Sequence, residues 1–338
     1  MNIIHILKKL TAKKDLSDAE AEGMMTALMK GEASPSQTAS FLTALAMKGE
    51  STEEMTAFVK VMRSCALPVS VAGKVLDTAG TGGSGLVRLN VSTAVCFVLA
   101  ALGVKVAKHG NRKFGGNCGS FDLLEALGAK IDLTPEQVEK IIARTNLGFM
   151  FAPLFHPSMK HVAPVRKDIG IRTVFNFLGP LTNPAGARHQ LLGVSSLEVA
   201  PKLVEVLKNL GSDHVLVVRG EDGLDEITPC GATRVWELKE GNIGEFTLQP
   251  EDFGMNRAEF EEIKGGDIAY NKNIIEKVLR GSLRDARRDI VMLNSAAGLI
   301  AYDETHTFEE GIQMARTALE SGKVGQKLDE YISASRDV

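Results

Sequence analysis

The chain has few cysteines. Its 338 residues include four, Cys65, Cys96, Cys118 and Cys230, and no two of them form a CxxC pair. A disulfide framework and a structural zinc site both require cysteines at characteristic spacings, so this pattern argues against either. We therefore expect a reduced compartment and a cytoplasmic protein.

Long apolar runs are also missing. The longest, residues 94–104, is well short of the roughly 20 residues that a membrane-spanning helix needs. Residues 1–10 contain His5 and the pair Lys8-Lys9, and are too short and too polar for the apolar core of a signal peptide. We expect no association with a membrane.

The charge is nearly balanced, with 39 basic and 42 acidic side chains and a formal net charge of −3. This balance gives no long-range attraction for a polyanion, so nucleic acid is not an expected partner. A local phosphate site remains possible, because it needs only a few well-placed donors. The length and the 44% hydrophobic content are typical of a folded protein of about two domains.

The first 65 residues show the pattern of successive short helices. Three capping boxes each precede a segment with helical apolar spacing. They are Ser17 with Glu20, Ser34 with Gln37, and Ser51 with Glu54. We predict a small all-helical domain over residues 1–70, which should pack against another part of the chain because it is too small for a large core of its own.

From about residue 74 the pattern changes to strands that alternate with helices. This alternation predicts a larger α/β domain with a mainly parallel central sheet, over residues 71–164 and 184–338. The intervening segment is rich in proline and arginine, and we predict a helix over residues 165–177 in it. Residues 165–183 would then return to the helical domain and make that domain discontinuous in sequence.

A glycine-rich turn follows the first predicted strand. Residues 77–85 read Asp-Thr-Ala-Gly-Thr-Gly-Gly-Ser-Gly, and Asn90-Val91-Ser92-Thr93 begins the next helix. Such a turn exposes backbone N–H groups beside the positive end of a helix, which favours a bound phosphate. The pattern is neither GxGxxG nor GxxxxGK[ST], so it indicates neither a dinucleotide fold nor a P-loop. The alternative is a tight turn without a ligand.

A basic segment follows the second predicted strand. Residues 108–112 read Lys-His-Gly-Asn-Arg. Ligands of open α/β sheets bind beyond the carboxyl ends of the strands, where this segment and the glycine turn would lie together. A solvated basic turn is the other interpretation.

An acidic segment follows the predicted strand over residues 214–218. Residues 222–226 read Asp-Gly-Leu-Asp-Glu. Adjacent carboxylates that face a phosphate site would suit Mg²⁺, which prefers oxygen ligands. A solvated acidic turn is the commoner explanation of such a pair by itself.

These three motifs, in this order, resemble those of the anthranilate phosphoribosyltransferase family, of the nucleoside-phosphorylase-like class. The resemblance extends to Phe151-Ala152-Pro153, to the residues from His156 to Arg166, and to residues 172–184. It implies transfer of a phosphoribosyl group from phosphoribosyl pyrophosphate to anthranilate in tryptophan biosynthesis. It also implies Mg²⁺ as cofactor and a homodimer formed through the helical domain.

The resemblance also implies roles for individual residues. The donor-binding residues that it implies are Gly80, Gly82, Gly83, Asn90, Ser92, Thr93, Lys108 and Ser120. We also expect Ser84, Arg88 and Asn111 to contact the donor. Gly80, His109, Asn111 and Arg166 would bind anthranilate. Ser92, Asp225 and Glu226 would bind Mg²⁺. No residue is assigned as a general acid or base, because an aniline nitrogen is neutral at pH 7 and positioning can matter more.

The departures from the family pattern gather on the donor side. Ser84 stands where the family usually has an acidic residue, and Arg88 where it usually has Thr or Ser. Residues 113–120 read Lys-Phe-Gly-Gly-Asn-Cys-Gly-Ser in place of a run such as Ser-Val-Ser-Ser-Lys-Ser-Gly-Ser. The glycines at 115 and 116 would let backbone N–H groups replace the lost hydroxyls. The expected acceptor residues Asn111 and Arg166 are kept.

Two alternatives stay open from the sequence. The first is a related glycosyl-transfer enzyme with another donor or acceptor, including a pyrimidine-nucleoside-phosphorylase-like activity that uses free phosphate. The second is a non-catalytic relative that binds nucleic acid or a protein partner. A continuous basic face would favour the second, and the net charge of −3 does not.

Overall fold

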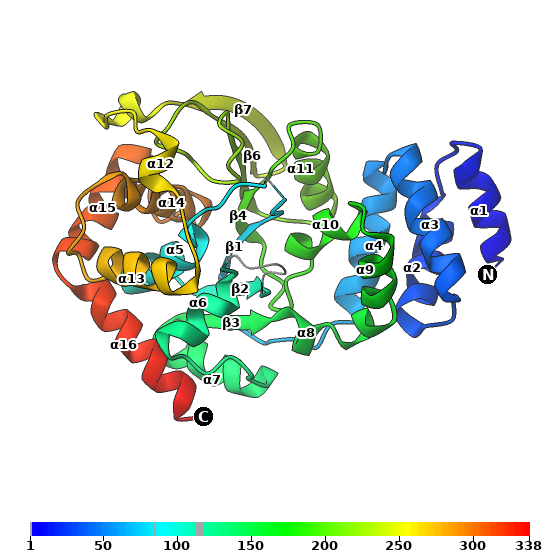
Figure 1. Cartoon of the computed structure of the whole chain (residues 1–338), viewed down its shortest axis with the longest axis horizontal. Helices are drawn as coiled ribbons and strands as arrows, with labels where there is room; N and C mark the ends of the chain where they lie inside the picture. Colours follow the sequence, from blue (N-terminus) through cyan, green and yellow to red (C-terminus); the bar gives the residue numbers. More distant parts are fainter. Residues whose placement is uncertain (1, 84, 113–117) are drawn as a thin grey trace.

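The computed structural model describes residues 2–83, 85–112 and 118–338 (Figure 1). Ser84 and residues 113–117, on which part of the donor-site prediction falls, lie outside the described residues. A bundle of N-terminal helices forms one end of the long axis, and a sheet flanked by helices forms the remainder. Within the described residues, no helix has both the length and the apolar character needed to cross a membrane.

The N-terminal bundle has four described helices, one more than the capping boxes mark. They are α1 (Ile3–Thr11), α2 (Asp18–Lys30), α3 (Pro35–Lys48) and α4 (Thr52–Ser64). All three predicted capping boxes are confirmed, at the starts of α2, α3 and α4. The first helix has a different signal, because the Asn2 side chain accepts a hydrogen bond from the His5 N–H at 3.2 Å.

A segment from the middle of the chain covers the bundle. It contains the 3₁₀ turns η1 (Pro157–His161) and η2 (Gly179–Leu181) and the short helices α9 (Ala163–Ile169) and α10 (Phe175–Leu178). Here η1 contacts α2, α9 contacts α3 and α10 contacts α4. The predicted continuous helix over 165–177 is wrong. Gly170 ends α9 in the left-handed conformation with φ 64°, which a glycine adopts without steric cost.

The predicted mainly parallel sheet is confirmed. The described residues form seven strands in the order β3-β2-β1-β4-β5-β6-β7, of which the first five run parallel and the last two form an antiparallel extension. The strands are β1 (Leu76–Gly80), β2 (Val106–Gly110), β3 (Leu147–Phe151), β4 (His189–Gly193), β5 (His214–Gly220), β6 (Thr233–Lys239) and β7 (Asn242–Leu248).

Helices bury both faces of the sheet (Figure 1). On one face Leu216 and Phe97 belong to a core shared with the C-terminal helices. On the other, Val217 belongs to a core shared with the bundle, whose α4 contacts the sheet helix α11. The helices of this part are α5 (Val91–Ala101), α6 (Ser120–Leu127), α7 (Pro135–Thr145), α8 (Ala152–Phe155), α11 (Ala200–Asn209), α12 (Phe260–Ile263), α13 (Ile268–Leu279), α14 (Ala286–Ala301), α15 (Phe308–Glu320) and α16 (Lys323–Arg336), with a 3₁₀ turn η3 (Pro250–Phe253).

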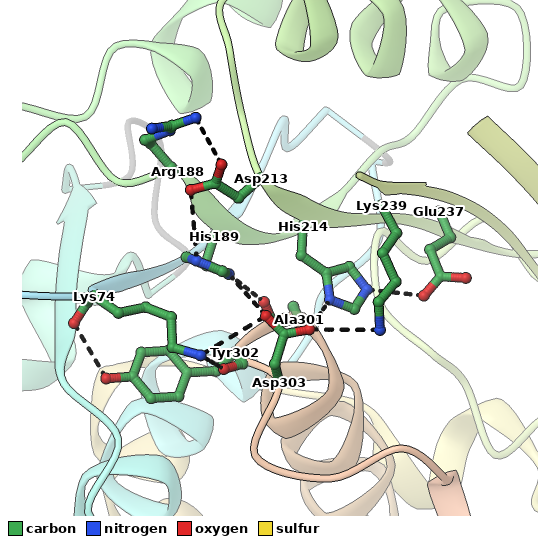
Figure 2. A network of polar contacts seen from close by, with 10 residues as sticks. All are labelled: Lys74, Arg188, His189, Asp213, His214, Glu237, Lys239, Ala301, Tyr302 and Asp303. Atoms are coloured by element: carbon green, nitrogen blue, oxygen red, sulfur yellow. Dashed lines mark hydrogen bonds and ion pairs between the residues drawn. The ribbon is translucent and has the colours of Figure 1, made fainter. Parts of the chain in front are cut away.

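A polar network closes the amino-terminal edge of the sheet (Figure 2). His214, the buried first residue of β5, places Nδ1 2.7 Å from Asp303 and Nε2 2.8 Å from Glu237. Hydrogen bonding to His214 lowers the pKa of Glu237. Burial opposes the same effect at Asp303, yet the hydrogen bond from His214 and nearby lysines leave that pKa lowered as well. The network joins β5, β6 and the end of α14.

We expect His214→Gln to lower the free energy of unfolding at pH 7 by about 1.5–3 kcal/mol, the usual range for hydrogen bonds to charged groups. Carboxyl groups with lowered pKa stabilise the fold above their unfolded pKa, and this contribution is lost as the pH falls through the folded value. The deficit of the variant should therefore shrink toward pH 3. Urea unfolding at both pH values measures it, with the exposed His306→Gln as control. An equal deficit at both pH values would contradict the ionic explanation.

Candidate active site

Four neighbouring strands end in glycine at the opposite edge of the sheet: Gly80, Gly110, Gly193 and Gly220. A Cβ at Gly193 would overlap the carbonyl oxygen of Asp225, and one at Gly80 would lie 2.6 Å from the Asp225 carboxylate. The missing side chains thus let the acidic segment close directly over the ends of β1 and β4. The predicted meeting of the glycine turn and the acidic segment at this edge is what the structure shows.

The glycine turn is held from two sides. Gly82 and Gly83 have φ of 64° and 82°, the left-handed region where a side chain is strained. The Gly82 N–H donates to Asp225 Oδ2 at 3.1 Å, and the Ser195 hydroxyl donates to the Gly82 carbonyl at 2.7 Å. These contacts fix the backbone of the turn beside the acidic segment.

Two carboxylates differ in their surroundings within the acidic segment. Asp225 is buried and forms an ion pair with Arg88. Glu226 is half-buried, and burial raises its pKa to about 7 against the opposing effects of Arg88, Lys108 and the Ser92 N–H. The carboxylate of Glu226 therefore faces the first turn of α5, which brings Ser92 to the acidic segment as predicted.

The start of α5 is tied to distant segments. Asn90 precedes α5, but its side chain makes no capping hydrogen bond to the first turn of that helix. Its amide donates to the Cys118 carbonyl at 3.0 Å and accepts from Asn271 at 3.1 Å. The Thr93 hydroxyl is buried, and no hydrogen-bond partner for it occurs among the described atoms. Asn90 thus serves at least partly to join α5, α6 and α13.

The basic segment is not simply a solvated turn. Lys108 and His109 are buried, and Lys108 donates to the Thr78 carbonyl of β1. Asn111 is exposed just beyond β2, and the Phe121 N–H donates to its carbonyl at 3.5 Å. That contact puts Ser120, the first residue of α6, close to Asn111.

A second histidine faces His109. The rings of His109 and His156 lie 4.8 Å apart between centroids. Burial lowers the pKa of His109 to about 3, with a further contribution from His156, and burial lowers the pKa of His156 to about 4. Within the described part of the chain the Nε2 atoms of both rings have no partner. The pair is therefore uncharged at neutral pH.

Two arginines come from the segment that covers the bundle. The guanidinium of Arg166 lies 5.2 Å from the centre of the Phe175 ring, and burial lowers its pKa. Arg172 reaches the glycine turn, donating to the Gly83 carbonyl at 3.4 Å and to Ser195 Oγ at 3.3 Å. Arg172 thus links the segment packed on the bundle to the expected phosphate site.

Comparison with known proteins agrees with this arrangement. Residues 4–66 match the helical bundle domain of a glycosyl transferase family, and residues 72–324 match its a/b domain. The anthranilate phosphoribosyltransferase of Chloroflexus aggregans is 46% identical over 337 residues, covering 99% of both chains. This chain belongs to the anthranilate phosphoribosyltransferase family. Its members are glycosyltransferases of tryptophan biosynthesis, so the predicted family and enzyme class are confirmed.

Solved structures agree with the family assignment. The anthranilate phosphoribosyltransferase of Thermus thermophilus superposes with a TM-score of 0.93 at 43% identity, over 98% of this chain and 99% of that one. The Saccharomyces cerevisiae enzyme in complex with PRPP and Mg gives a TM-score of 0.92 at 28% identity, over 99% and 98%. The fold is therefore that of the family over nearly the whole chain.

Three residues of the site were not assigned a role from sequence: His156, Arg172 and Ser195. His156 and Arg172 stand in stretches that carry the family resemblance, but nothing in their local pattern shows which residue they contact. Ser195 follows β4, a strand that the sequence pattern did not reveal. For Ser195, a position just beyond the carboxyl end of β4 would have been the signal.

The histidine pair predicts acid sensitivity. A histidine with a lowered folded-state pKa stabilises the fold fully above its unfolded pKa of about 6.5, and this stability is lost as the pH falls toward the folded value. Between pH 7.5 and 5 we expect a loss of about 2 kcal/mol for each buried histidine, because one pKa unit is worth about 1.36 kcal/mol.

Urea unfolding across this range measures the loss. The double variant His109→Gln/His156→Gln should show a much shallower pH dependence, and His306→Gln should match the wild type. An unchanged slope in the double variant would show that other groups cause the acid sensitivity.

Proposed function

We propose that this chain transfers the phosphoribosyl group of phosphoribosyl pyrophosphate to the amino group of anthranilate and releases pyrophosphate. The observation that carries the proposal is the contact between the glycine turn and the acidic segment, Gly82 N–H to Asp225, at the carboxyl ends of β1 and β4. It is supported by relatives from Saccharomyces cerevisiae that were solved with PRPP and Mg and with 4-fluoroanthranilate.

The donor would bind at the glycine turn. The Gly82 N–H already donates to Asp225, so the phosphate would be held by other N–H groups of the turn and by the positive end of the α5 dipole. The proposed donor contacts are Gly80, Gly82, Gly83, Arg88, Asn90, Ser92, Thr93, Lys108, Asn111 and Ser120, with Ser84 outside the described residues. Lys108 would approach the donor from the β1 side of the turn, because its ammonium group donates to the Thr78 carbonyl of that strand.

The oxygen atoms of this site fit Mg²⁺ held jointly with a substrate. Among the described residues no cluster of three or more His, Cys, Asp or Glu side chains could hold a metal by itself. Mg²⁺ commonly uses one or two carboxylates and completes its shell with substrate phosphates and water. Ser92 and Glu226 would hold it, together with Asp225. When bound, Mg²⁺ would offset the negative charge that develops on the diphosphate.

The acceptor would lie beside the buried histidines. His109, with Gly80 and Asn111, would line the anthranilate site, and Arg166 would bind the carboxylate, to which a guanidinium can donate two parallel hydrogen bonds. Neutral rings at His109 and His156 suit a neutral aromatic amine. Phe175 holds the Arg166 guanidinium in place by stacking.

The chemistry is a substitution at C1 of the ribose. The bond from C1 to the diphosphate oxygen breaks, and its electron pair leaves with pyrophosphate. The bond from C1 to the anthranilate nitrogen forms, and that nitrogen loses one proton. Donors fixed at the turn stabilise the leaving group where its charge develops.

The organisation around this site is also part of the proposal. We infer a helical domain of residues 1–70 with the returning segment 165–183, and an α/β domain of residues 71–164 and 184–338. A cytoplasmic homodimer through the helical domain would cover exposed apolar side chains there, such as Ile4 and Met47.

The test is an assay with phosphoribosyl pyrophosphate, anthranilate and Mg²⁺. We expect anthranilate fluorescence to change as pyrophosphate appears in a one-to-one ratio. Turnover of a pyrimidine nucleoside with free phosphate, and none with phosphoribosyl pyrophosphate, would favour the phosphorylase-like alternative. Turnover of neither would favour the non-catalytic one.

A further inference from the structure

The backbone around Arg88 is fixed from the C-terminal part of the chain. Arg88 forms an isolated antiparallel bridge with Lys264, and its carbonyl accepts from Asn271 Nδ2 at 3.2 Å. The Gly265 N–H donates to the Val87 carbonyl at 3.1 Å, and a Cβ at Gly265 would overlap the Arg88 carbonyl. The connection between α12 and α13 therefore fixes the backbone of Arg88, from which the side chain extends.

The Arg88 guanidinium lies between the glycine turn and the acidic segment. Its Nη1 pairs with Asp225, and its Nη2 would be 3.6 Å from a Cβ at Gly82. Its charge also acts on the Glu226 carboxylate. The side chain is 25% exposed, so it is open to a ligand at the turn. A permanent cation thus stands where the diphosphate and Mg²⁺ are proposed to meet.

We propose that Arg88, one of the proposed donor contacts, takes over part of the role of Mg²⁺. In this role, which rests on the proposed function, Arg88 neutralises Asp225 and also donates to the diphosphate. A guanidinium has five N–H donors in a planar fork, so it can keep a carboxylate and bind a phosphate oxygen together. Asp225, already paired, attracts a free cation less strongly, and Glu226 is the main carboxylate left for the metal.

Two consequences follow. The donor binds measurably in the absence of divalent cations, because a protein cation already faces the diphosphate. The protein alone binds a divalent cation weakly, because one of its two carboxylates is paired. Replacing Arg88 by threonine, a residue that the family resemblance leads one to expect here, should reverse both properties.

The experiment compares the full-length wild type with Arg88→Thr. Calorimetric titration with phosphoribosyl pyrophosphate in EDTA should show at least about tenfold weaker binding in the variant, the size expected for loss of a charge-assisted contact, with a smaller difference at saturating Mg²⁺. Titration with Mn²⁺ alone, followed by electron paramagnetic resonance, should show tighter binding in the variant. Arg257→Thr, which removes an exposed arginine paired with Glu251, is the matched control and should behave as wild type.

The unpaired Asp225 could impair folding of Arg88→Thr, so Arg88→Thr/Asp225→Asn is a second variant that removes both charges. It should fold and still lose donor binding in EDTA. Donor binding in EDTA that is as tight in both variants as in the wild type, or unchanged Mn²⁺ affinity in Arg88→Thr, would overturn the inference alone. A wild type that binds no phosphoribosyl pyrophosphate even with Mg²⁺ would overturn the proposed function and this inference together.

Discussion

Gly193→Ala is expected to lower kcat/KM by about a hundredfold or more. The added Cβ would overlap the carbonyl oxygen of Asp225, so either β4 or the acidic segment must move. A displacement of about 1 Å in a catalytic group can cost about a hundredfold in rate. The φ of Gly193 lies outside the left-handed region, so the effect comes from the new side-chain atom and not from backbone strain.

Steady-state kinetics and urea unfolding together test this expectation. Overpacking in a central strand should cost about 1–3 kcal/mol of stability, which still leaves a folded protein for assay. Gly244→Ala is the matched control: it also lies in a strand, β7, and its Cβ would have no neighbour within 4 Å. Wild-type kinetics in Gly193→Ala would show that activity does not depend on the observed position of the acidic segment.

Elements with a strong local signal were predicted best. The capping boxes at Ser17, Ser34 and Ser51 bind their own backbone three residues on, so no distant contact is needed to specify them. Strand β4 escaped prediction because it starts with His189 and Gln190, polar residues whose burial depends on partners elsewhere. The helix predicted over 165–177 is wrong because Gly170, in the left-handed conformation, ends α9 inside that range.

The motifs of the site could be recognised from local composition, but the contacts between them could not. The glycine turn and the acidic segment are each visible in the sequence, whereas the contact that joins them is between residues 143 positions apart. The pairing of His109 with His156 requires β2 to lie beside β3, where His109 is in register with Met150. Arg88 drew attention as a departure from the family, yet only the fold shows that it pairs with Asp225. Contacts of this kind depend on strand order, which local spacing does not encode.

The two acidic residues should respond oppositely to removal of their charge. Asp225→Asn leaves the Arg88 guanidinium without its carboxylate, so we expect a loss of stability of about 3 kcal/mol, as for a broken buried ion pair. Glu226→Gln removes a carboxylate whose pKa burial raises, so the fold should lose nothing and can gain stability at pH 8.

Glu226→Gln should impair activity although it spares the stability of the fold. We expect Glu226→Gln to lower kcat/KM by about a hundredfold to a thousandfold, because a charge that holds the cation at the leaving diphosphate is gone. The loss should be largest at limiting Mg²⁺, so the Mg²⁺ dependence of the rate is the measurement. Glu221→Gln, an exposed glutamate just before the acidic segment, should keep wild-type kinetics. Full activity of Glu226→Gln at limiting Mg²⁺ would show that the Glu226 carboxylate does not hold the metal, and would move the neutralising role in the reaction toward Arg88 and Lys108.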